Sequence, residues 1–144
     1  DMVFQRKFSE KSLILVNSIY PTRVADALLA KAKIGNGHAA DFIIKYGLFR
    51  RLLGLKNAFC DGDEPVMLND LEACNNYQLD LSELKNLRIP ISIILGSKDR
   101  LVDLKAVENF TNAVSCHTHT MGEVGHFSFF EDPDNLSKLI SEIA

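Results

Sequence analysis

The chain has 144 residues, of which 47% are hydrophobic and 24% charged, and its formal net charge is -3. This balance is typical of one globular domain and excludes a disordered or fibrous chain, and it offers nucleic acid no basic surface beyond a small cluster at Arg50, Arg51 and Lys56. No apolar run reaches the length of a membrane span and the first residues lack a signal-peptide pattern, so we expect a cytoplasmic protein with no membrane partner.

The first predicted element is a strand at residues 12–18, SLILVNS. It is a continuous apolar run bounded by polar residues, which is typical of a strand covered on both faces in a parallel sheet. Residues 19–80 separate it from the next strand, far more than one crossover helix needs. We interpret this segment as a helical insertion, with helices predicted over 22–33, 38–47, 48–59 and 64–77.

After the insertion, helices and strands alternate. The sequence predicts a helix over 81–87 that begins after Asp80, a strand at 91–96, ISIILG, and a Thr-rich strand nearer the sheet edge at 116–121, CHTHTM. Helices with predicted N-caps at Asp103 and Asp132 follow the second and third strands. Right-handed crossovers make the strands parallel, so the loops after the second and third strands should open on the same rim of the sheet.

Two side chains suited to acid-base chemistry lie in those two loops. Asp99 follows the second predicted strand, and His126 follows the third, in the segment GEVGHFSFF. Histidine exchanges protons near neutral pH, and a carboxylate bound to its Nδ1 fixes the tautomer and stabilises the imidazolium. The sequence therefore predicts half of a catalytic triad. Gly122 and Gly125 are expected to allow the sharp turn that brings His126 into a cleft.

The surrounding motifs extend beyond these two residues. The acid stands in IPISIILGSKDRLVD as G-x-x-D, from Gly96 to Asp99, and the histidine stands in GEVGHFSFFEDPDNL as G-H before an Asp-Pro helix start. In both respects the chain resembles the α/β-hydrolase fold family. The resemblance covers the whole chain, most specifically from residue 87 onward. It implies a partial α/β-hydrolase with about three parallel strands, flanking helices and an inserted helical cap.

The resemblance also divides the chain into three parts. Residues 1–18 match the end of a helix and the first core strand, residues 19–80 the cap, and residues 81–144 the C-terminal part of the core, with the acid and histidine loops. The family's nucleophile elbow, G-x-S-x-G, and its His-Gly oxyanion loop are absent from the sequence. By family order both belong upstream of residue 1, so we expect this chain to be inactive alone.

The resemblance implies that the parent protein is a serine hydrolase of a small ester, thioester or amide. Asp99 would orient His126, the nucleophile would lie outside this chain, and no cofactor or metal is implied. Two alternatives remain open. A haloalkane dehalogenase-like enzyme with an Asp nucleophile would use the same two residues, and a non-catalytic binding or assembly module built on the half-fold would use neither. The coding sequence upstream of Asp1 would distinguish them.

Other polar residues near the predicted site receive structural interpretations. Asp103 is an alternative acid but suits an N-cap, and His38 suits a helix start. His117 and His119 share one face of a strand, where no third metal ligand is positioned, and are interpreted as surface or edge residues. Two nearby serines do not stand on an elbow between glycines and are not replacement nucleophiles: Ser97 and Ser128.

Several apolar residues suit either a substrate pocket or the core. An aromatic cluster beside a helix start is usually core, which is our interpretation of Phe127, Phe129 and Phe130. Four cap residues fit both roles equally: Leu48, Phe49, Leu52 and Leu53. An odd number of cysteines without CxxC spacing argues against a disulfide framework or a zinc site and favours reduced thiols at Cys60, Cys74 and Cys116.

The first strand also predicts a partner. In the family's sheet it lies beside the strand that leads to the nucleophile, so in this chain one of its sides lacks hydrogen-bond partners. We therefore expect self-association through residues 12–18, or pairing with the missing N-terminal part.

Overall fold

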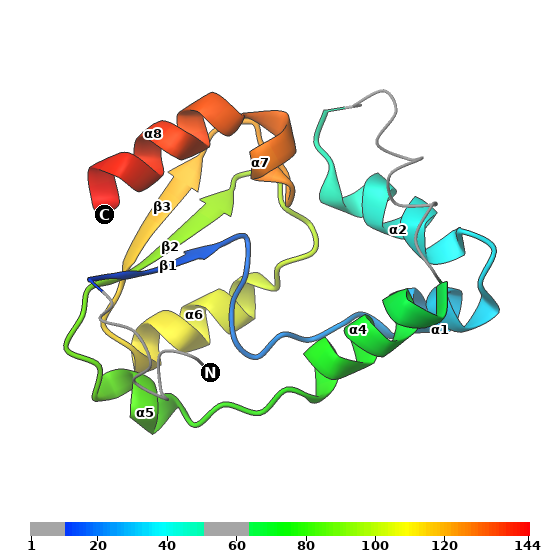
Figure 1. The fold of residues 1–144 in the computed structure, drawn as a ribbon, viewed down its shortest axis with the longest axis horizontal. Coiled ribbons are helices and arrows are strands. Elements are labelled where there is room, and N and C mark those ends of the chain that lie inside the picture. Colours follow the sequence, from blue (N-terminus) through cyan, green and yellow to red (C-terminus); the bar gives the residue numbers. More distant parts are fainter. Residues whose placement is uncertain (1–10, 51–63) are drawn as a thin grey trace.

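The structure is a computed structural model that describes residues 11–50 and 64–144. Within these residues a parallel sheet has the strand order β1-β2-β3. Leu13 pairs with Ile91 across β1 and β2, and Ser92 pairs with His117 across β2 and β3. The predicted parallel strands are confirmed (Figure 1), with the bounds β1 (Leu13–Val16), β2 (Ile91–Gly96) and β3 (His117–Met121).

The central strand is β2, and every one of its residues is buried. Strands flank it on both sides and helices cover both of its faces, which explains its continuous apolar sequence. Strand β3 lies at an edge and is mostly exposed, as its Thr-rich sequence indicated. The residues of β1, predicted to be covered on both faces, are only partly buried, because within the described part of the chain no strand flanks its outer side.

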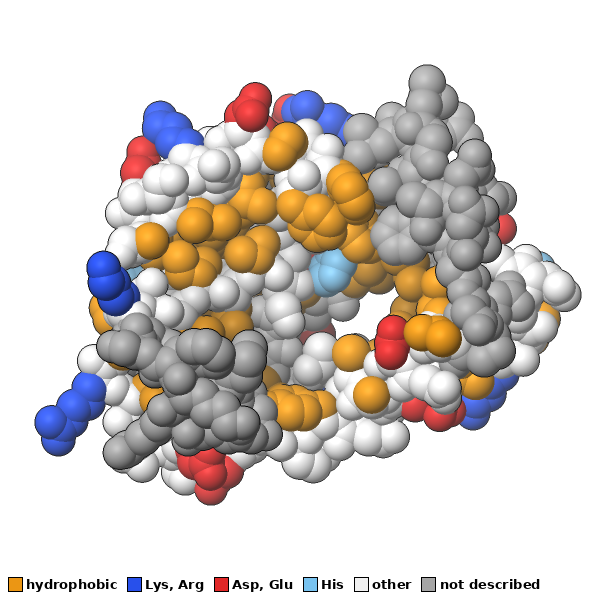
Figure 2. Space-filling model, in the orientation of Figure 1, with side chains coloured by type: hydrophobic (Ala, Val, Ile, Leu, Met, Phe, Trp, Pro, Cys, Tyr) orange, Lys and Arg blue, Asp and Glu red, His pale blue; other side chains and the backbone are white. Residues whose placement is uncertain are grey.

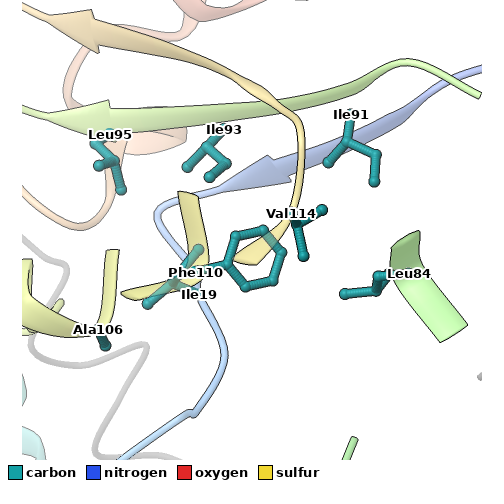
Figure 3. Close-up of a cluster of buried hydrophobic side chains, with 8 residues drawn as sticks. All are labelled: Ile19, Leu84, Ile91, Ile93, Leu95, Ala106, Phe110 and Val114. Carbon is teal, nitrogen blue, oxygen red and sulfur yellow. The ribbon is translucent and has the colours of Figure 1, made fainter. Parts of the chain in front are cut away.

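Two apolar clusters sandwich the sheet. On one face, α5 (Leu81–Lys85) and α6 (Leu104–Ala113) pack against the strands (Figure 3). The buried residues of the cluster on this face are Ile19, Leu84, Ile91, Ile93, Leu95, Ala106, Phe110 and Val114. On the opposite face, α8 (Pro133–Ile143) packs Leu136 against Ile94, Met121 and Val124. Carboxylates cap the N-termini of these three helices as predicted: Asp80, Asp103 and Asp132.

The helical insertion stands at one end of the sheet (Figure 1). Its helices, α1 (Asp26–Ile34), α2 (His38–Gly47) and α4 (Glu64–Asn76), share a small core of their own. Helix α1 begins later than predicted, because Ala25 has extended backbone angles, with a ψ of 134°, and serves as the N-cap. Most of the helix predicted over 48–59 lies outside the described residues.

The predicted boundaries at residues 18 and 80 lie close to the end of β1 at Val16 and the start of α5 at Leu81. The division into three parts itself stays a prediction. Each helix within residues 11–50 and 64–144 is too short or too polar to cross a lipid bilayer.

Candidate active site

The loops that follow the three strands meet at one rim of the sheet. Asn17 follows β1, the segment 97–99 follows β2, and the segment 122–126 follows β3. The N–H of Ser97 donates to the carbonyl of Met121 at 2.9 Å, and the N–H of Lys98 donates to that of Val124 at 2.9 Å. These bonds hold the loops after β2 and β3 side by side, as the parallel topology predicted.

Asp99 and His126 are in direct contact at this rim. Oδ2 of Asp99 lies 2.9 Å from Nδ1 of His126. The Asp99 side chain is only 4% exposed, whereas that of His126 is 27% exposed. Because an ionised carboxylate only accepts hydrogen bonds, Nδ1 carries the proton, which leaves Nε2 as the acceptor of the ring. The geometry thus gives a shielded acid and an accessible base.

The carboxylate of Asp99 is held from several directions. Its Oδ1 accepts the N–H groups of Leu101 at 2.8 Å and Val102 at 3.1 Å. Burial raises the pKa of Asp99, but the hydrogen bond and charge of His126, followed by the two backbone amides, outweigh burial and bring the pKa below its usual value. Asp99 is therefore ionised at neutral pH and suited to stabilise an imidazolium.

The lowered pKa of Asp99 predicts how stability depends on pH. A depressed folded-state pKa stabilises the fold above the unfolded pKa, about 3.9 for aspartate, and this contribution is lost as pH falls through the folded value. We expect Asp99→Asn to flatten the fall in unfolding free energy below about pH 4. Urea unfolding at several pH values measures it, with Asp103→Asn as the control for removing one negative charge. An unchanged slope in Asp99→Asn would contradict the prediction.

Asn17 is part of this site and was missed by the sequence analysis. It is buried, and its backbone has a φ of 47°, which asparagine tolerates better than most residues. Its Nδ2 donates to Asp99 Oδ2 at 3.3 Å and to the carbonyl of Gly125 at 3.2 Å, and its Oδ1 accepts the hydroxyl of Ser128 at 2.5 Å. Asn17 thereby links all three loops. Its position directly after an apolar strand, like that of Asp99, is the signal that could have found it.

Close packing at the rim requires a glycine at position 96. A Cβ added to Gly96 would lie 2.2 Å from the carbonyl oxygen of Gly125, so only glycine lets the two loops approach this closely. The prediction that Gly122 and Gly125 supply unusual backbone angles is wrong. In their loop the positive φ, 52°, belongs to Glu123, whose N–H donates to Ser97 Oγ at 2.9 Å.

A cleft of about 1300 Å³ opens between this rim and the helical insertion. Figure 2 shows a hollow bordered by hydrophobic side chains. His126 and Phe127 lie at the core side of the cleft, and their rings meet edge to face with centroids 5.2 Å apart. The insertion contributes Leu28, Phe42, Ile43, Tyr46 and Leu71. Polar and charged side chains line the rest of the cleft, among them Arg23, Asp26 and Arg100. A concave site that combines apolar walls with polar groups is the usual form of a small-molecule site.

The structural interpretations of the other polar candidates agree with the structure. Asp103 Oδ1 accepts the N–H of Lys105, and α2 begins at an exposed His38. His117 and His119 lie on the edge strand β3. The hydroxyl of Ser128 is buried against Asn17.

The aromatic cluster after His126 differs from the expected core. Phe129 and Phe130 are 50% and 46% exposed, and they lie on α7 (Ser128–Glu131), a single helical turn that was not predicted, whose other two residues are buried. In the insertion, Leu48 is buried and Phe49 is 44% exposed. The described cysteines, Cys74 and Cys116, are free thiols. Five other candidates lie outside the described residues: Arg51, Leu52, Leu53, Lys56 and Cys60.

Comparison with solved structures identifies the fold. No family model and no curated protein matches the chain. An esterase from Exiguobacterium antarcticum matches with a TM-score of 0.80 at 14% identity, over 99% of this chain and 60% of that one. A 2-hydroxy-6-oxo-6-phenylhexa-2,4-dienoate hydrolase from Rhodococcus sp. strain RHA1 matches with a TM-score of 0.72 at 13% identity, over 98% and 57%.

A carboxylesterase from Bacillus subtilis matches with a TM-score of 0.71 at 15% identity, over 96% of this chain and 52% of that one. The chain therefore has a partial α/β-hydrolase fold, as the sequence predicted. It spans little more than half the length of these structures. At this level of identity the likeness establishes the fold, and the activity is a separate question.

Proposed function

We propose that this chain is the C-terminal part of a serine hydrolase that acts on a small ester, thioester or amide. Asp99 and His126 are the acid and the base of its triad, and the nucleophile lies outside this chain. The observation that carries the proposal is the shielded Asp99 carboxylate bound at 2.9 Å to Nδ1 of His126, whose ring borders the cleft. The fold shared with esterases and other hydrolases supports it.

The geometry suits general acid-base catalysis of acyl transfer. Nε2 of His126 takes the proton of the serine hydroxyl as the oxygen attacks the substrate carbonyl, and later gives that proton to the leaving group. Asp99 keeps Nδ1–H in place and stabilises the imidazolium while it exists. The two backbone amides on Oδ1 and the amide of Asn17 on Oδ2 keep the carboxylate from rotating away.

The test of this proposal begins with the coding sequence upstream of Asp1. We expect it to encode G-x-S-x-G after an apolar strand, and a serine-directed phosphonate to label that serine in the complete protein. Labelling should fall sharply in His126→Ala, because the serine then lacks its base. An initiator methionine directly before Asp1, with no separate elbow-bearing chain, would overturn the proposal.

The 144-residue chain on its own should not hydrolyse esters. A general base alone supplies a factor of only about 10² to 10⁴, and neither an elbow nor its oxyanion loop is present in the sequence. Short-chain nitrophenyl esters incubated with the purified chain measure this. Turnover that a serine-directed phosphonate abolishes would reveal a nucleophile within the chain and contradict the prediction.

A further inference from the structure

Glu131 is a buried carboxylate that the acid-base pair does not use. It ends the short helix α7 and is only 8% exposed. Its Oε1 accepts the N–H of Gly125 at 3.0 Å, and its Oε2 accepts those of Phe49 at 3.0 Å and Arg50 at 2.9 Å. A buried, charged carboxylate that accepts three backbone N–H groups binds the segments that carry them strongly to one another.

The three donors come from two separate places in the fold. Gly125 immediately precedes His126, whereas Phe49 and Arg50 follow the end of α2 in the helical insertion. Beside them, the N–H of His126 donates to the carbonyl of Gly47, the last residue of α2, at 2.6 Å. The backbone around His126 is thus fastened to the end of α2 through Glu131 and through Gly47.

The packing leaves little room for this connection to shift. A Cβ added to Gly125 would lie 2.4 Å from the carbonyl oxygen of Gly47 and 2.7 Å from Oε1 of Glu131. A Cβ added to Gly47 would lie 2.5 Å from the ring of Phe127. Helix α2 also forms one wall of the cleft, through residues such as Phe42 and Tyr46.

We propose that Glu131 is a positioning residue that fixes the His126 loop to the end of α2, so that the placement of this cleft wall sets the orientation of the His126 ring. The inference rests on the proposed function for its catalytic meaning. The effect of Glu131 on the hydrogen bond between His126 and Asp99 can be measured without any catalytic turnover.

Glu131→Gln tests the inference with the smallest change. A carboxamide of the same shape offers one oxygen instead of two, so its NH₂ group must face either the N–H of Gly125 or those of Phe49 and Arg50. On that side the NH₂ group and a backbone N–H, both donors, face each other inside a buried site, so the hydrogen bond between residue 131 and that segment is lost. Glu123→Gln is the matched control, because Glu123 lies in the same loop and its exposed carboxylate approaches the Arg50 side chain at 3.9 Å.

The readouts are amide hydrogen exchange and the NMR signals of the His126 ring in the 144-residue chain. We expect amide exchange to accelerate at least about tenfold in Glu131→Gln on the side that the NH₂ group faces, either at Gly125 or at Phe49 and Arg50, since a hydrogen bond to a charged acceptor changes an opening equilibrium by that factor or more. The downfield Nδ1 proton of His126 should weaken or broaden, with circular dichroism unchanged. Glu123→Gln should alter neither signal.

An unaltered Nδ1 proton in a folded Glu131→Gln chain would overturn the inference and leave the proposed function intact. If Glu131→Gln fails to fold, Glu131→Asp tests the same connection: it keeps the charge but is one methylene shorter, so it cannot reach both sets of donors and should weaken the same proton signal. In the complete enzyme we expect Glu131→Gln to lower kcat more than it changes KM. If the complete wild-type protein catalysed no reaction, the proposed function would be overturned. The Nδ1 proton signal of His126 would still test whether Glu131 positions the ring.

Discussion

On the proposed function, His126→Ala and Asp99→Asn should each lower kcat of the complete protein by several orders of magnitude. Asp99→Asn keeps the shape of the side chain but can present its NH₂ group to Nδ1, which favours the wrong tautomer of the ring. In the Ser-His-Asp triad this change costs about 10⁴-fold. His126→Ala removes the base itself, so its effect should be at least as large. Steady-state kinetics with a nitrophenyl ester measure both.

Asp103→Asn is the matched control for the acid. Asp103 also lies beside the cleft, but its carboxylate accepts the N–H of Lys105 and caps α6. Asparagine is nearly as good an N-cap as aspartate, so stability and kcat should change little. If Asp103→Asn proved more damaging than Asp99→Asn, the acid of the triad would have been assigned to the wrong residue.

The second large effect concerns association. The isolated chain should form dimers or larger species, because β1 is an outer strand of the described sheet and its apolar residues are only partly covered. The simplest arrangement pairs two copies of β1 antiparallel across a two-fold axis. Where the complete protein supplies a neighbouring strand, that strand would take the place of the second copy. Light scattering across a concentration series measures the mass.

The backbone pattern of β1 shows where to place the disrupting substitution. On the β2 side, the N–H of Leu13 donates to the carbonyl of Pro90, and the N–H of Asn17 donates to the carbonyl of Ile94. By alternation the N–H of Ile14 points outward, so Ile14→Pro removes an outward donor and leaves the ladder with β2 intact. Leu15→Ala is the control, because it trims the side chain and keeps every outward donor. A monomeric wild-type chain at high concentration would show that the edge is covered within the chain.

The sequence predicted those parts of the fold that depend on local pattern. The apolar run of β2 and the N-caps at Asp103 and Asp132 are local signals, and the structure bears them out. The contact between Asp99 and His126 also followed, because parallel strands bring the loops after them to one rim.

Glu131, which holds the His126 loop in place, was not predictable in the same way. Glu131 binds backbone N–H groups, which every residue except proline carries, so no side-chain pattern marks its partners. The start of α1 at Asp26 and the single turn α7, which carries the exposed Phe129, likewise have no local signal in the sequence. Such features are set by tertiary contacts, which override local propensity.

The contacts of Asn17 join segments that are far apart in the sequence, and this separation bears on how the site assembles. Asp99 and His126 are 27 residues apart in the sequence, whereas Asn17 is separated from Asp99, Gly125 and Ser128 by 82, 108 and 111 residues. Closing the longer loops costs about 1 kcal/mol more chain entropy, and contacts between distant residues form slowly. We therefore expect a refolding chain to form the acid-base pair before Asn17 joins it, so that the amides of Leu101 and Val102 alone hold the carboxylate until the first strand joins the sheet.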